Sequence, residues 1–96
     1  MSNMPAEPLL EERHVLSETA FAELAVWRVP APVRGSAHDY RYRLALVVDG
    51  KCVLRYDNEA GKGDHRHVGD REHEYRFRSA RQLLADFWTD VEEIVK

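Results

Sequence analysis

Two histidines, His65 and His67, stand one residue apart in the middle of this 96-residue chain. In an extended backbone, side chains two positions apart point to the same side of a sheet. Imidazole titrates near neutral pH, so such a pair suits acid and base chemistry. Two short polar side chains precede the pair in the sequence. The candidate catalytic residues are therefore His65, His67, Asp57 and Asn58.

Cationic side chains accompany the histidines, and several of them alternate with aromatic residues in strand-like runs. The guanidinium groups of arginines bind phosphates through paired hydrogen bonds, and exposed aromatic rings stack on bases. A base, an acid and a cation are what metal-free RNA cleavage needs. We therefore expect an RNA-binding surface, with no cofactor, and the predicted phosphate-binding residues are Arg55, Arg66, Lys62, Arg41, Arg43 and Arg76.

Two other interpretations of the same residues remain open. The arginines of a solvated sheet face also form cross-strand pairs with acidic neighbours. Alternatively, His65-x-His67 followed by Glu72 resembles the first metal motif of cupins, and three such side chains could ligate a divalent ion. The second cupin motif is missing from the sequence. Metal binding by His65, His67 and Glu72 is thus the minority alternative.

Composition favours one globular domain in a reducing compartment. The net charge is −3, and there is one cysteine and no long apolar run. We expect a cytoplasmic protein without a membrane segment, in which Cys52 is a small buried apolar residue. Residues 1–8 contain two prolines and are predicted to be a flexible tail, with residues 9–96 forming a single α+β domain.

The strongest local signal is a hairpin from Tyr40 to Tyr56. Asp49-Gly50 is a preferred pair for a two-residue type I′ turn, and apolar runs flank it. If the strands pair without interruption, Val48 faces Lys51. The pairs further from the turn would then be Leu46–Val53, Leu44–Arg55 and Tyr42–Asp57.

Further strands are predicted near residues 11–17, 21–29, 65–68 and 73–78. Ser79 and Gln82 have the spacing of a capping box, and an apolar stripe at helical spacing follows them. The predicted fold is α+β, an antiparallel meander of about five to six strands with a C-terminal amphipathic helix on one face. The other face would need the N-terminal tail (Met4, Leu9, Leu10), a second copy in a homodimer, or another protein to cover it.

With these residues in place, the chain resembles the TumE family of small toxins. The resemblance lies in Arg55-Tyr56-Asp57-Asn58, in His65-Arg66-His67 and in Trp27-Arg28-Val29-Pro30. It implies the toxin component of a bacterial or archaeal toxin–antitoxin system, paired with a DNA-binding antitoxin encoded by the neighbouring gene. Three hypotheses follow: a toxin that binds or cleaves RNA, a non-catalytic interaction protein, and a small cupin-like metal-binding barrel.

Overall fold

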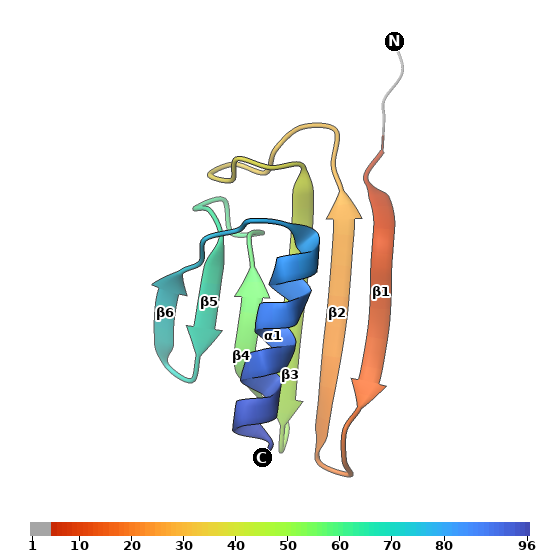
Figure 1. Cartoon of the computed structure of the whole chain (residues 1–96), viewed down its shortest axis with the longest axis vertical. Helices are drawn as coiled ribbons and strands as arrows, with labels where there is room; N and C mark the ends of the chain where they lie inside the picture. Colours follow the sequence, from red (N-terminus) through yellow and green to blue (C-terminus); the bar gives the residue numbers. More distant parts are fainter. Residues whose placement is uncertain (1–4) are drawn as a thin grey trace.

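The computed structural model describes residues 5–96, which form one antiparallel sheet and one helix (Figure 1). The sheet has six strands, and their spatial order follows the chain from β1 to β6. This confirms the predicted α+β meander. The elements are β1 (Glu7–Val15), β2 (Ala20–Arg28), β3 (Tyr40–Val48), β4 (Lys51–Asp57), β5 (His65–Val68), β6 (Arg71–Glu74) and α1 (Ala80–Ile94).

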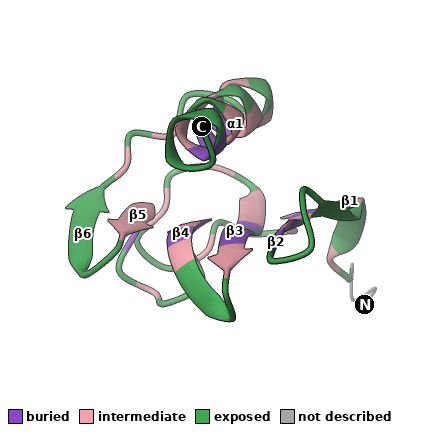
Figure 2. Cartoon of the chain, turned by 90° about the horizontal axis from the view of Figure 1, so that it is seen from below, coloured by how far each residue is buried: buried purple, intermediate pink, exposed green. Residues whose placement is uncertain are grey.

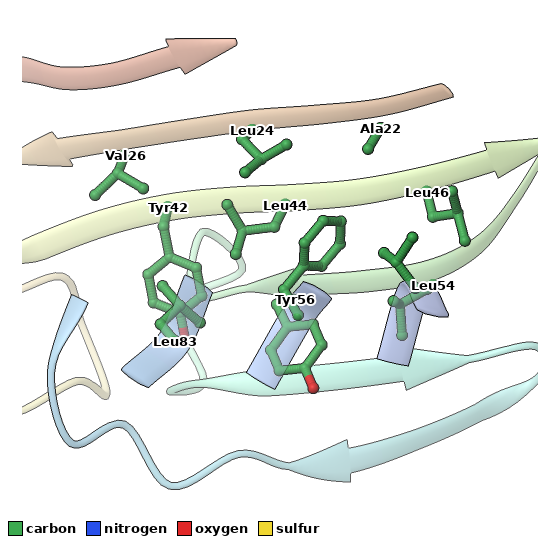
Figure 3. Close-up of a cluster of buried hydrophobic side chains, with 11 residues drawn as sticks. Ala22, Leu24, Val26, Tyr42, Leu44, Leu46, Leu54, Tyr56 and Leu83 are labelled. Carbon is green, nitrogen blue, oxygen red and sulfur yellow. The ribbon is translucent and has the colours of Figure 1, made fainter. Parts of the chain in front are cut away.

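The core lies between α1 and the middle of the sheet. Helical spacing brings Leu83, Phe87 and Val91 onto one stripe of α1, and this stripe is buried against the sheet. Figure 3 shows many of these core side chains together. Burying each large apolar side chain contributes about 1.5–3 kcal/mol. The strands supply the rest of the core at a period of two: Ala22, Leu24, Val26, Tyr42, Leu44, Leu46, Leu54 and Tyr56.

The start of α1 agrees with the predicted cap only in part. The Ser79 hydroxyl accepts a hydrogen bond from the backbone N–H of Gln82 at 3.0 Å. The Gln82 side chain donates to Asp86 instead of reaching back to residue 79, so the capping box is half formed. The strand expected over residues 73–78 ends at Glu74. Beyond it the chain leaves the sheet, and Phe77 stacks on His38 with ring centroids 3.6 Å apart.

The hairpin turn forms as predicted. Asp49 and Gly50 both have positive φ, 52° and 77°, as a type I′ turn requires, and Val48 pairs with Lys51. The register beyond the turn differs from the prediction. A β-bulge leaves Val53 without a partner, so that Leu46 pairs with Leu54 rather than with Val53.

This bulge decides which way the end of β4 faces. The predicted pairs Leu44–Arg55 and Tyr42–Asp57 are wrong, because Leu44 pairs with Tyr56 and Asp57 pairs with Arg43. A one-residue slip moves every later side chain to the other face of a strand. The bulge therefore turns Leu54 and Tyr56 toward α1, and it turns Arg55 and Asp57 away from the core.

The sheet face opposite α1, here called the open face, is covered by none of the elements formed by residues 5–96 (Figure 2). Leu10 packs against the core on the helix side, and Leu9 is 45% exposed; Met4 lies outside the described residues. The strand β1 begins at Glu7, inside the stretch expected to be a tail. Cys52 is exposed, so its predicted burial is wrong.

The predicted barrel alternative is also wrong. The sheet is open, with β1 and β6 as its two edges, whereas a cupin-like barrel closes two sheets on each other. No helix among the described residues has both the length and the apolar character needed to cross a bilayer.

Candidate functional site

The predicted histidines lie on the open face, beside the polar end of β4. Arg55 pairs with His67 and Asp57 pairs with His65 across the β4–β5 ladder. Glu72 stands opposite His67 on β6. These residues are joined by a lysine from the β4–β5 loop. We call the group the open-face cluster: Arg55, Asp57, Lys62, His65, His67 and Glu72.

The ring of His67 is held by Arg55. A guanidinium nitrogen of Arg55 lies 3.2 Å from Nε2 of His67. Because a guanidinium only donates, Nε2 accepts, and the ring proton of the neutral imidazole is on Nδ1. The Nε of Arg55 also forms an ion pair with Oδ2 of Asp57 at 2.7 Å. Asp57 therefore orients Arg55, which in turn orients the acceptor nitrogen of His67.

His65 has the opposite arrangement of its ring nitrogens. Its Nε2 donates to the backbone carbonyl of Lys62 at 2.8 Å. Its Nδ1 faces Oε1 of Glu72 at 3.2 Å. A proton taken up at Nδ1 would thus lie directly against a carboxylate. The Nε2 atoms of the two histidines therefore differ in role, since that of His67 accepts a hydrogen bond and that of His65 donates one.

Glu72 connects the histidines to Lys62. The Lys62 ammonium lies 3.1 Å from Oε1 of Glu72, and Nε2 of His67 lies 4.0 Å from the same oxygen. The hydrogen bond from Lys62, together with its charge, lowers the pKa of Glu72. Within residues 5–96, no group of three His, Cys, Asp or Glu side chains is arranged to hold a metal ion. The geometry therefore gives the metal alternative no support.

Asn58, a predicted catalytic residue, lies apart from the open-face cluster. Its side chain is 0% exposed. Its Oδ1 accepts the backbone N–H of Tyr42 at 3.0 Å. Its Nδ2 donates to the Tyr40 carbonyl at 2.7 Å and to the Ser36 hydroxyl at 3.1 Å. Asn58 therefore ties the end of β4 to β3 and to the loop between β2 and β3.

A second polar group, centred on Asp64, was not predicted from the sequence. Asp64 accepts from the Tyr42 hydroxyl at 2.7 Å and from Nε2 of His38 at 2.8 Å. Nδ1 of His38 accepts the backbone N–H of Tyr40, which assigns the ring proton to Nε2. Burial and the bond to Asp64 raise the pKa of Tyr42. The partners are 22 and 26 residues from Asp64 along the chain, so no short sequence motif could have predicted this group.

The glycine-rich turn before Asp64 is packed rather than loose. Gly63 has a φ of 92°, and its backbone lies against Gly35 of the β2–β3 loop. A Cβ built on Gly35 would come within 2.4 Å of the Gly63 nitrogen. Only glycine allows this approach. The contact fixes the loop that carries Lys62 toward Glu72.

Arg66 lies on the helix side of the sheet. Its Nε forms an ion pair with Oδ2 of Asp90 at 2.7 Å, and the Tyr56 hydroxyl donates to the same oxygen. The bond to Asp90 raises the pKa of Arg66, whereas burial and then the same carboxylate raise the pKa of Tyr56. Arg66 is therefore engaged in holding α1 and is separated from the cluster by the sheet.

The other predicted phosphate-binding arginines lie in two different parts of the fold. Arg41 and Arg43 alternate with the core-facing residues of β3 and so lie on the open face. The Arg41 guanidinium stands over the Trp27 ring, 4.8 Å from its centroid. Arg43 is exposed next to Asp57 in the ladder. Arg76 follows β6 and is exposed in the connection to α1. The open face thus gathers Arg41, Arg43, Arg55 and Lys62, but not Arg66.

Comparison with known protein families matches residues 5–95 to the family described as "Toxin TumE". The match covers nearly the whole chain and confirms the resemblance found in the sequence. Neither a curated protein nor a solved structure matches the chain.

Proposed function

This chain belongs to the TumE toxin family, the toxin component of a toxin–antitoxin system, and from that premise we propose that it acts on RNA through its open face. The proposed activity is metal-independent cleavage. The observation that carries it is the pair of histidines on β5, whose Nε2 atoms have opposite partners and which lie beside Arg55 and Lys62. Its partner is the antitoxin, which we propose is a DNA-binding protein encoded beside it.

The spacing of the histidines suits a phosphodiester. Two residues of one strand stand about 7 Å apart, so a phosphate fits between their side chains. Once Arg55 turns to the phosphate, Nε2 of His67 takes the proton of the ribose 2′-hydroxyl. The 2′-oxygen bonds to phosphorus and the bond from phosphorus to the 5′-oxygen breaks. The Glu72 carboxylate covers the buried Nδ1 of His65 and must turn away first. Protonated His65 then gives its Nδ1 proton to that leaving oxygen, which produces a 2′,3′-cyclic phosphate and a 5′-hydroxyl.

The cations would stabilise the transition state. Arg55 and Lys62 stand beside the histidines and can pair with the equatorial phosphate oxygens. Asp57 holds Arg55 from behind and is itself 8% exposed. We therefore assign His65 and His67 to proton transfer, Arg55 and Lys62 to phosphate binding, and Asp57 to positioning.

The test is RNA cleavage by purified protein in the presence of a metal chelator. We expect His67→Ala to lower the rate by about 100-fold or more, as loss of a general base typically does. The matched control is His73→Ala, since His73 is an exposed histidine on β6 opposite Arg66 and outside the cluster. Thermal melting must show that both variants fold. Equal cleavage by wild type and His67→Ala would contradict the assignment.

A non-catalytic inhibitor is the second candidate, favoured by the uncovered open face. Inducible expression, with and without the neighbouring gene, separates the two. Cleavage predicts growth arrest by unaccompanied wild type and none by His67→Ala. If His67→Ala arrests growth as wild type does while Arg43→Ala does not, the toxin acts by binding through the open face.

A further inference from the structure

A groove of about 530 Å³ runs over the open face beside the cluster, and residues of β1, β2, β3 and β4 line it. None of the residues assigned to proton transfer lines it. Its floor contains two alanines, Ala25 and Ala45, at positions where neighbouring residues are larger. The volume lies in the range of small-ligand sites. The side chains around Ala25 determine what kind of ligand fits.

Four side chains surround Ala25. In the ladders Ala25 pairs with Glu11 on one side and with Arg43 on the other, each about 5 Å away. Along β2, Trp27 and Glu23 are two residues away in either direction, about 7 Å from it. All four line the groove. A flat ligand over the Ala25 methyl group would therefore meet an indole, a guanidinium and two carboxylates.

Trp27, the aromatic residue of the groove, has a cation next to its ring. The Arg41 guanidinium lies over the Trp27 ring, and its Nε is buried without a hydrogen-bond partner. A base can stack on an indole or on a guanidinium plane, since both are flat. Arg41 does not itself line the groove, so it supports the indole from behind, and the indole is the flat surface that the groove offers to a ligand. This end of the groove is thus suited to a nucleotide.

The carboxylates restrict the choice of base. Glu11 and Glu23 only accept hydrogen bonds when ionised, so they favour bases that carry amino donors. Glu23 also pairs with Arg13, another residue of the groove, at 3.9 Å. Guanine offers an N–H and an amino group side by side to one carboxylate. Uracil has one N–H between two carbonyl oxygens, which the carboxylates would repel. A phosphate is disfavoured at the same place for the same reason.

We propose that the groove over Ala25 is a subsite for an amino-bearing nucleobase, guanine above all, of the RNA strand that the open-face cluster binds. This inference rests on the proposed function. Ala25, Arg43, Asp57 and His65 lie in one row across the sheet, which spans three strand spacings or about 14 Å. The base in the groove therefore belongs to a nucleotide away from the cleaved bond, and Arg43 bridges the two places.

The two tryptophans allow a direct test. Trp27 lies on the open face, whereas Trp88 packs against the core from α1, so Trp88→Phe leaves Trp27 as the reporter. The ligands are a 2′-O-methyl uridine hexanucleotide and the same strand with one central guanosine, neither of which can be cleaved. We expect quenching of Trp27 and at least about tenfold tighter binding of the guanosine strand, the size of one hydrogen bond to a charged group.

Filling the groove should abolish the preference. Ala25→Leu places a side chain where the base would lie, and we expect it to remove the tenfold advantage of guanosine. The matched control is Ala85→Leu, the same substitution at an exposed position on α1, which should keep the preference. Glu11→Gln and Glu23→Gln should each reduce it, because an amide is a poorer acceptor than a carboxylate.

The outcomes separate this inference from the proposed function. Equal affinity for the two strands, or unchanged Trp27 emission while RNA is still cleaved, would overturn the subsite and leave the cleavage proposal standing. A Trp27 response to the antitoxin but to neither strand would also overturn it and assign the groove to a protein. Guanosine preference without any cleavage would support the subsite and count against the ribonuclease.

Discussion

Arg55 and Asn58 are close neighbours in the sequence, yet their side chains do different things. Arg55 reaches the open face and holds His67, whereas Asn58 is fully buried and bonds to the backbone of β3. Both belong to the run that carries the family resemblance. A buried amide that satisfies a backbone donor and a backbone acceptor is needed for stability. Motif residues therefore need not share a role.

The expected effect of Asn58→Ala is structural. The change leaves the Tyr42 N–H and the Tyr40 carbonyl unpaired in the core, which should lower the free energy of unfolding by about 2–4 kcal/mol. Urea denaturation measures this, with Glu59→Ala as the exposed neighbouring control. A variant that keeps its stability but loses RNA cleavage would instead place Asn58 in the reaction.

At the scale of elements, β4 and α1 decide which side chains reach the site. The bulge at Val53 moves Arg55 and Asp57 to the open face, and the side chain of Asp90 on α1 binds Arg66 and Tyr56 on the other side. The sheet separates the two groups. Arg66 and His67 are adjacent in sequence, but one fastens the helix and the other faces the proposed substrate.

The prediction for Arg66 follows from its partner. Arg66→Ala removes a charged hydrogen bond between β5 and α1 and should lower the free energy of unfolding by about 1–3 kcal/mol. RNA affinity should change little at a temperature where the variant is folded. Arg76→Ala, at an exposed position, is the control for stability. A loss of RNA affinity without a loss of stability would restore Arg66 to the phosphate-binding set.

At the scale of the whole molecule, three tyrosine hydroxyls hold separate parts of the fold together. Each of them donates a hydrogen bond to a carboxylate on a loop or on α1. Tyr42 donates to Asp64, Tyr56 to Asp90, and Tyr75 to Asp86. In each case burial first, and then the bond to the carboxylate, raises the pKa of the phenol above its ordinary value of 10.0. The folded protein needs all three phenols protonated.

This requirement predicts a loss of stability in alkali. Tyrosines of the unfolded chain ionise near pH 10, whereas those of the folded chain keep their protons to higher pH. The stabilisation is complete below pH 10 and falls as the pH rises above it, by up to about 1.4 kcal/mol per pH unit for each tyrosine. Urea unfolding at a series of pH values measures the slope. Tyr56→Phe should reduce this slope, and a slope equal to that of the wild type would contradict the assignment.

Much of this protein could be predicted from local sequence. The Asp49-Gly50 turn, the strand at residues 65–68 and the stripe of Leu83, Phe87 and Val91 all depend on neighbours a few residues apart, and all three formed as expected. The side of the sheet shared by His65 and His67 follows from the two-residue period of a strand. Features of this kind can be predicted from the sequence because the residues that determine them are only a few positions apart in the chain.

Only the tertiary structure decided which of the polar residues meet. The bulge at Val53 reversed the faces of Arg55 and Asp57, because apolar Leu54 and Tyr56 had to reach the core together. The Asp64 group and the groove over Ala25 join residues from separate strands and loops. Sequence fixes which side chains are available, whereas the register between strands fixes their neighbours, and register depends on burying the core as a whole.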